Sequence, residues 1–417
     1  MADGVRSLEV QFNRFIGNDR VTVGQIIEGW GEPTFASSAG RHVLAIQDTS
    51  NINIRTTDQR RRGLGEVGKG HSYGVLLHPM LSVDADTGCC LGLATGAVWT
   101  RKGRVTTPHG KRKLSEKESS RWIDTAETAK PVLAAAKTVT MVADREADFF
   151  ALWALVPERN VHVLGRVHYD RPLVGGGHLK SVADTWKLAG TRHVSVRERP
   201  DRPERVAELQ IRYGAVTIKR PRKVREPGIA KQVALILVDV TEVNQPDGIE
   251  PLHWMLITTH AVDCVEKAWN VVSWYQMRWI IEQFFRTLKA QGFRIEQTQV
   301  WTAERIIKLV AIAAHAAVIT MQMVQARDGR SGEPAQIAFS AAQISTLSAI
   351  EKSYIESTPT RNNPHRNSSM AWAAWIIARL GGWDGYCSSR PPGPITYRNG
   401  LNLFYQIHRG AILVCMP

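Results

Sequence analysis

The sequence has few of the features that mark secreted, cysteine-rich or membrane proteins. Its 417 residues include only five cysteines, which form neither a metal-binding nor a disulfide spacing. The first ten residues, MADGVRSLEV, lack the charged-then-apolar layout of a secretion signal. The longest apolar run, about 309–319, contains His315 and is shorter than the ~20 residues that cross a bilayer. We therefore expect a soluble cytoplasmic protein without a membrane partner.

Acidic residues are also in deficit. The chain has 53 Lys and Arg against 39 Asp and Glu, a net charge of +14. A basic excess of this size indicates a polyanionic partner, nucleic acid before a membrane surface, although basic enzymes without DNA partners are common. Hydrophobic residues make up 43% of the chain, enough for a sizeable core in two or three domains.

The expected elements divide the chain into three regions. Residues 1–40 have a helical, polar pattern, and residues 41–300 alternate short apolar runs with helical stretches. A strand-like and strongly basic stretch at about 160–250 interrupts this second region as a β-rich insertion. Residues 301–417 are mainly helical. This order predicts a mixed α/β core followed by a helical C-terminal region.

Two aspartates stand at the ends of predicted strands. HVLAIQD is a short apolar run that ends at Asp48, and TVTMVAD is a second that ends at Asp144. A long helical stretch, 262–292, carries Glu282. A lone Asp at a strand end is usually a turn or cap residue. Asp84 and Asp86, expected in a turn, compete for the role of second ligand.

Three carboxylates brought to one point repel one another unless cations lie between them. Oxygen ligands of this kind suit Mg²⁺ or Mn²⁺. Two such ions ~3.5–4 Å apart can activate a water or a 3′-hydroxyl and stabilise the leaving oxygen of a phosphodiester. The acidic residues are therefore candidates for metal-dependent phosphoryl transfer.

The helical stretch around Glu282 gives a more informative pattern. At ~100° per residue, Tyr275, Arg278, Glu282 and Lys289 share one narrow stripe, and apolar residues cluster on the other side. An acid flanked by two cations and a phenol suits a phosphodiester substrate. A solvated face with ordinary i,i+3 and i,i+4 pairs would give the same pattern.

The same stretch resembles a known signature. YQMRWIIEQFFRTLK has the spacing Y-x2-R-x3-E-x6-K of the insertion-sequence-four family of bacterial DDE transposases, the group that includes the Tn-five transposase. DREAD at 144–148 and IQDTS around Asp48 resemble the family's two acidic motifs. PLHWMLIT at 251–258 resembles the strand before the catalytic helix. Four ordered motifs are more specific than any one of them.

The resemblance implies a ribonuclease-H-like mixed sheet with the β-rich insertion between the second Asp and the Glu. Asp48, Asp144 and Glu282 would be the catalytic residues and would bind two Mg²⁺ ions, with Mn²⁺ as a substitute. The resemblance also implies that Trp254 receives an unstacked base, for which an indole ring is a good platform. The implied DNA-binding residues are Tyr275, Arg278, Lys289, Trp254 and Arg166.

The implied activity is cut-and-paste DNA transposition in the bacterial cytoplasm, associated with the nucleoid. It comprises nicking, hairpin formation and opening, and strand transfer. The DNA partners would be double-stranded terminal repeats and a target. A homodimer, joined through residues 301–417, would hold the paired ends. Because Asp48 lies closer to the N-terminus than is usual in the family, we expect residues 1–40 to be a truncated DNA-binding region.

Three alternatives stay open at this point. A nuclease on the same core would cut DNA without strand transfer. An inactive remnant, shortened at its front, would bind DNA and inhibit the full-length enzyme. A glycoside hydrolase with paired carboxylates would not need Arg278 and Lys289 beside the acid.

Overall fold

The computed structural model gives the arrangement of most of the chain. The residues that it describes are 2–54, 63–68, 72–103, 107, 108, 112–196, 198, 203–224, 228–354, 362–386 and 388–415. Within them, one mixed sheet of eleven strands has the order β2-β4-β1-β6-β7-β11-β10-β9-β8, and β3 and β5 pair with β4 off this path.

The first half of the sheet places the two aspartates. β1 runs parallel to β6, β6 runs parallel to β7, and β4 is antiparallel to β1. The last five residues of both β1 and β6 are buried, as expected for strands covered on two faces. The strands are β1 (His42–Gln47), β2 (Ser50–Asn53), β3 (Gly65–Glu66), β4 (Tyr73–Asp84), β5 (Cys90–Trp99), β6 (Thr138–Ala143) and β7 (Val161–Arg166).

The strand-rich region predicted at 160–250 continues this same sheet. β11 pairs antiparallel with β7, and β10, β9 and β8 follow in antiparallel order. β7 lies inside the predicted range, but it belongs to the parallel part of the sheet. The bounds are β8 (Gly190–Val196), β9 (Arg205–Lys219), β10 (Gln232–Glu242) and β11 (His253–Thr258), with the short helix α5 (Leu179–Val182) before β8.

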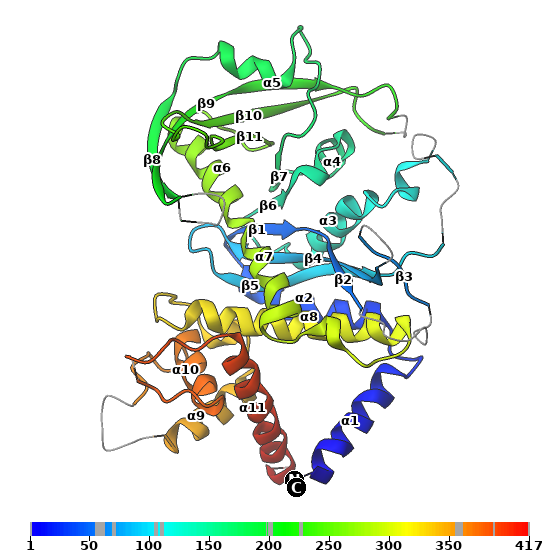
Figure 1. The fold of residues 1–417 in the computed structure, drawn as a ribbon, viewed down its shortest axis with the longest axis vertical. Coiled ribbons are helices and arrows are strands. Elements are labelled where there is room, and N and C mark those ends of the chain that lie inside the picture. The colour runs from blue at the N-terminus through cyan, green and yellow to red at the C-terminus, as the bar shows by residue number, and fades with distance from the viewer. Residues whose placement is uncertain are drawn as a thin grey trace.

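Helices cover both faces of the sheet (Figure 1), and the sheet separates two apolar cores. Because side chains alternate along a strand, Leu44 and Ile46 of β1 pack in the cluster that includes α2, α6, α7 and α8, whereas Val43 and Ala45 pack with α3 and α4. The helices are α2 (Val23–Ser38), α3 (Ser120–Val132), α4 (Phe150–Leu155), α6 (Val265–Met277), α7 (Ile280–Arg286) and α8 (Ala303–Ala326).

The long helix predicted over 262–292 is broken. α6 ends at Met277, α7 begins at Ile280, and the segment Thr287–Gln291 is a π-helix. Between α6 and α7 the backbone N–H groups bond three residues back instead of four, as from Trp279 to the Gln276 carbonyl at 3.2 Å. The single straight helix assumed for the polar stripe was therefore wrong. The tighter turn sets Arg278 at the junction.

α8 contains the apolar run 309–319. With 24 residues, α8 is long and apolar enough to cross a membrane by length and composition alone, because it extends beyond the apolar run on both sides. However, 67% of its apolar window is buried inside the protein. The core helix of a globular protein has the same composition, and α8 packs against the sheet and α2.

A third apolar cluster joins the end of α8 to α9 (Ala341–Lys352), α10 (Met370–Leu380) and α11 (Pro394–Cys415). Trp372 is fully buried there. In Figure 1, α11 extends away from the sheet on the same side as α1 (Ala2–Ile16), and both termini lie at that end. The C-terminal part is thus helical, as the sequence predicts.

Candidate active site

Asp48 and Asp144 lie at one edge of the sheet. They follow the parallel strands β1 and β6 directly, and these strands are neighbours. One Asp48 carboxylate oxygen, Oδ1, accepts the Thr49 N–H at 2.7 Å. The Asp144 carboxylate accepts the Glu146 N–H at 2.8 Å and caps the short 3₁₀ turn Arg145–Ala147. Strand direction thus brings the first and second acidic residues together.

These acids perturb one another. Burial and, after it, the charge of Asp144 raise the pKa of Asp48 to about 7, against the opposing effects of the Thr49 N–H and Arg278. Burial and Asp144 also raise the pKa of Glu146. A raised carboxyl pKa means that negative charge is disfavoured here, because charge is desolvated and repelled by its neighbours. A cation would relieve that repulsion.

Arg278 connects the first and third acids. Its guanidinium donates from Nη1 to Asp48 Oδ2 and from Nη2 to Glu282 Oε1, both at 3.4 Å. The Asp48 side chain is 18% exposed and that of Glu282 is 37% exposed. Among the described residues, no group of three or more His, Cys, Asp and Glu is arranged to hold a metal ion. In this structure Arg278 bridges the Asp48 and Glu282 carboxylates.

The donor chemistry nevertheless fits a hard divalent cation. Carboxylate oxygens are the ligands that Mg²⁺ prefers, and the pKa of Asp48 is raised by burial and then by the negative charges of Asp144 and Glu146. Arg278 supplies the balancing cation, yet its Nε is buried without a hydrogen-bond partner. The contacts of Arg278 are long for charge-assisted hydrogen bonds, so this residue is only loosely held between the acids.

A phenol and a second arginine lie beside Arg278. Burial raises the pKa of Tyr275, while the charges of Arg278 and Arg166 oppose that rise. The Arg278 guanidinium is 5.9 Å from the centre of the Tyr275 ring and 5.5 Å from that of Trp279. Trp279 is 45% exposed. The structure thus groups Tyr275, Arg278 and Arg166 near Asp144, whose charge also acts on Tyr275.

Lys289 has a different neighbour. Its ammonium lies 4.0 Å from Glu296, and burial lowers its pKa. Glu296 in turn accepts the backbone N–H of Asn53 in β2 at 3.0 Å. Lys289 lies in the π-helical segment after α7, where it pairs with Glu296 rather than with Glu282.

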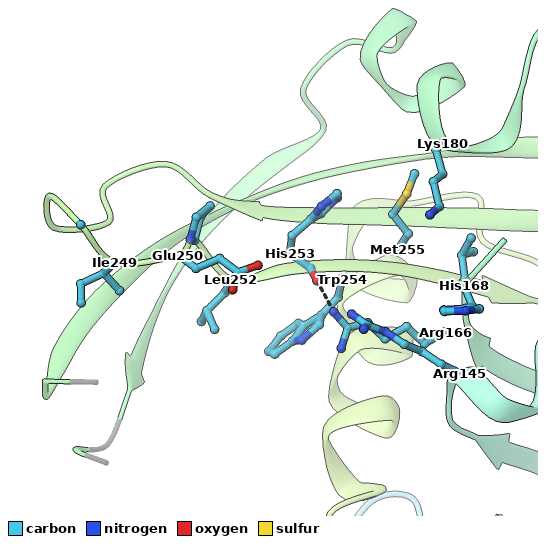
Figure 2. A pocket seen from close by; sticks show the side chains of 13 residues that line it. Arg145, Arg166, His168, Lys180, Ile249, Glu250, Leu252, His253, Trp254 and Met255 are labelled. Carbon is cyan, nitrogen blue, oxygen red and sulfur yellow. Dashed lines mark hydrogen bonds between the residues drawn. The ribbon is translucent and has the colours of Figure 1, made fainter. Parts of the chain in front are cut away.

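A cavity of about 790 Å³ lies next to the acids. Arg145, which follows Asp144, lines it together with Arg166, His168, Lys180 and Trp254. Figure 2 shows Arg145 and Arg166 extending toward Trp254, and the Arg166 Nη2 donates to the His253 carbonyl at 2.7 Å. The cavity thus combines an aromatic surface with several cations, a combination that suits a nucleotide.

Of the five lining residues named above, the sequence analysis missed Arg145, His168 and Lys180. Arg145 had a signal, because it follows Asp144 inside DREAD. His168 and Lys180 had none, because they come from the segments after β7 and are brought to the cavity by tertiary folding.

Asp84, considered as an alternative ligand, is used elsewhere. Its carboxylate accepts the N–H groups of Asp86 and Thr87 at 3.0 and 2.9 Å, and it pairs with Arg41 at 2.9 Å. The expected turn is confirmed. These contacts hold Asp84 at the end of β4, where the turn binds Oδ1 and Arg41 binds Oδ2.

The central part of the chain is similar to a known protein family. Residues 115–319 match the family model described as Transposase DDE domain. This segment is just under half of the chain. It includes Asp144 and Glu282, and it begins after Asp48. The central part of the chain is therefore similar to transposase DDE domains.

Solved structures include one transposase with limited similarity. The piggyBac transposase, in a synaptic complex with hairpin DNA, is 12% identical to this chain. The alignment covers 70% of this chain and 53% of that one, with a TM-score of 0.27. The match thus spans about half the length of that transposase, and at this score we draw no argument from it.

Proposed function

We propose that the protein is a DDE transposase of the insertion-sequence-four type, which cuts DNA at the ends of an insertion element and joins them to a target. One observation carries the proposal. Asp48 and Asp144 follow neighbouring parallel strands, and Glu282 is linked to Asp48 through Arg278. The match of residues 115–319 to a transposase DDE domain supports it.

Asp48, Asp144 and Glu282 would hold the two Mg²⁺ ions of such an enzyme, and Mn²⁺ could replace them. Bound ions of this kind activate an attacking oxygen and stabilise the leaving oxygen of a phosphodiester. Binding of divalent cations would free Arg278 from its 3.4 Å contacts with Asp48 and Glu282. The guanidinium would then be available for a backbone phosphate of the DNA, the bidentate partner that arginine prefers.

The remaining residues of the site would bind and orient DNA. Tyr275, Arg278 and Arg166 form one polar group beside Asp144 and would hold phosphates near the cut end. Lys289 would add a phosphate contact from the segment after α7. The cavity is large enough for a base, and Trp254 would stack on an unpaired base while Arg145 and Arg166 hold its phosphate.

The proposed reaction comprises nicking, hairpin formation, hairpin opening and strand transfer, on duplex terminal repeats and then on target DNA. A ribonuclease-H-like arrangement of β1, β4, β6 and β7 would form the catalytic core, with β8–β10 as the insertion. Two copies would act together on paired ends, and the C-terminal helices would provide the contact between them.

The test is a cleavage assay on a labelled duplex that carries the element's terminal repeats. We expect the wild-type protein to cut it in Mg²⁺ and to give a hairpin product, and Glu282→Ala to give none. Glu266→Ala removes an exposed carboxylate from the first turn of α6 and serves as the matched control. Cutting without hairpins or strand transfer would indicate a simple nuclease. Binding without cutting in Mg²⁺ and Mn²⁺ would indicate an inactive DNA-binding remnant.

A further inference from the structure

The first acidic residue lies in a gap between two strands. β1 ends with Gln47 opposite Met80 of β4, and β2 begins with Ser50 opposite Leu77 of the same strand. Asp48 and Thr49 cross from one strand to the other without ladder pairing to β4. His78 lies on β4 between the two paired stretches. The backbone alone therefore does little to hold the Asp48–Thr49 link, so side chains must do so.

The His78 side chain contacts the residues on both sides of this gap. Its side chain is fully buried, its Nδ1 lies 2.8 Å from the Thr49 hydroxyl oxygen, and its Nε2 lies 3.1 Å from Gln47 Oε1. The Trp122 ring of α3 packs edge-on against the His78 ring, with 4.8 Å between the ring centres. Burial lowers the pKa of His78 to about 3, so the ring is neutral. In the tautomer that satisfies both contacts, Nε2–H donates to Gln47 and Nδ1 accepts the Thr49 O–H.

Thr49 passes this constraint to the carboxylate. Its backbone N–H donates to Asp48 Oδ1 at 2.7 Å, the shortest contact that the structure gives that group. The hydroxyl of the same residue is held by His78. The rotation of the Asp48 carboxyl group is thus set by Thr49, and the position of Thr49 is set by His78 and Gln47.

We propose that His78 is a positioning residue that acts through the Thr49 hydroxyl to orient the Asp48 carboxylate for metal binding. The proposal rests on the proposed function, which makes Asp48 a metal ligand. Outer partners of this kind fix the direction of a ligand's lone pairs, and their loss typically weakens metal binding about 10–100-fold.

Packing alone does not explain why Gln47 and His78 are polar, because burying them costs free energy. Gln47 and His78 are both fully buried, and Gln47 Nε2 has no hydrogen-bond partner. A buried amide with an unpaired N–H costs free energy that an apolar residue of similar size would avoid. The positions on the same face of β1 and β4, Ala45 and Met80, are apolar and fully buried. The polar chain from Gln47 to Asp48 is therefore an exception within an apolar layer, and it leads to one carboxylate.

Thr49→Val tests the proposal with little change in shape. We expect about a tenfold rise in the Kd for Mn²⁺, measured without DNA from the free-Mn²⁺ electron paramagnetic resonance signal. The Mg²⁺ concentration for half-maximal cleavage should rise by a similar factor. Thr49→Ser keeps the hydroxyl and should restore the wild-type Kd within about twofold. Ser82→Ala is the matched control, because it removes a fully buried hydroxyl without a hydrogen-bond partner from β4, the strand that carries His78.

His78→Leu removes the same link from its other end. It should weaken Mn²⁺ binding as Thr49→Val does, and the double variant should be no weaker than either single one, because both act on one path. Wild-type-like Mn²⁺ binding by a folded Thr49→Val or His78→Leu protein would overturn the inference, as would equal losses in Ser82→Ala. If the wild-type protein itself neither binds Mn²⁺ nor cuts DNA, the proposed function fails instead.

Discussion

At the scale of single residues, the two aspartates of DREAD have different tasks. Asp144 lies at the site, whereas the Asp148 side chain is fully buried in an ion pair with Arg171 at 3.0 Å. Asp148 also accepts the N–H groups of His168 and Tyr169, at 2.6 and 2.8 Å. This pair therefore holds the turn after β7, which includes the cavity residue His168.

Arg171→Met should be strongly destabilising. It would leave the Asp148 carboxylate buried without its cation, and breaking one partner of a buried pair costs about 3–5 kcal/mol. We expect a loss of about 3 kcal/mol in the free energy of unfolding, measured by urea titration. Lys267→Met, in the exposed pair with Asp263, is the control and should leave the urea midpoint unchanged. Equal midpoints for both variants would show that the buried pair does not stabilise the turn.

The sequence predicted part of the site at this scale. The sequence singled out Asp48 and Asp144 by their positions at strand ends, and the structure brings them to one edge because β1 and β6 are parallel neighbours. The place of Arg278 between Asp48 and Glu282 could not be predicted, because it depends on the break between α6 and α7. A straight helix puts Arg278 and Glu282 on one stripe but says nothing about contact with β1.

At the scale of elements, three histidines join the sheet to α6. Thr140 of β6 forms hydrogen bonds at 2.7 Å with both His42 of β1 and His260, which follows β11. His162 of β7 stacks on His260 at 3.9 Å between ring centres. His42 and His260 also contact the Trp274 ring of α6, at 4.6 and 4.9 Å. α6 leads directly to Tyr275 and Arg278, so this cluster helps to place the site.

The cluster should make stability depend on pH. Burial lowers the pKa of His260 to about 3, aided by the charges of His162 and His42, and burial also lowers the pKa values of His42 and His162. Asp86 and Asp84 oppose the effect at His42. An unfolded histidine takes up its proton near pH 6.5. The unfolded state therefore binds more protons, and stability falls as pH drops below about 6.5.

His260→Gln should reduce this pH dependence. The amide can still bond to Thr140 but takes up no proton, so the fall in Tm from pH 7 to pH 5 should be smaller than in the wild-type protein. The exposed residue His178 provides the control His178→Gln, which should keep the wild-type fall. An unchanged fall in His260→Gln would mean that the cluster does not titrate on unfolding.

Sequence patterns predicted which segments form strands or helices better than they predicted where a helix is interrupted. The bounds and burial of β1 and β6 follow the apolar runs HVLAIQD and TVTMVAD closely. The break after α6 and the π-helix after α7 were not predicted. Apolar periodicity persists through such irregular turns, because Ile281, Phe284 and Leu288 all stay fully buried. The hydrogen-bond pattern of the backbone is therefore not readable from that periodicity.

At the scale of the whole molecule, one sheet brings distant segments together. Its eleven strands, within the described residues, run from the ladder of β1, β4 and β6 to the basic strands β8–β10. The sequence predicted the strands of this second part but not that β11 would join them to β7. That pairing depends on contacts far apart in the chain. It places Trp254 of β11 beside Arg166 at the end of β7, on one wall of the cavity.

The central claim is that Asp48, Asp144 and Glu282 act as one metal site, and a change of metal preference tests it most directly. Thiolate is a poor ligand for Mg²⁺ but binds softer ions better. Asp144→Cys should lose cleavage of the terminal-repeat duplex in Mg²⁺ by at least about a hundredfold and recover part of it in Mn²⁺. Asp86→Cys, in the turn after β4, should cut normally in both. Wild-type cleavage by Asp144→Cys in Mg²⁺ would contradict the account.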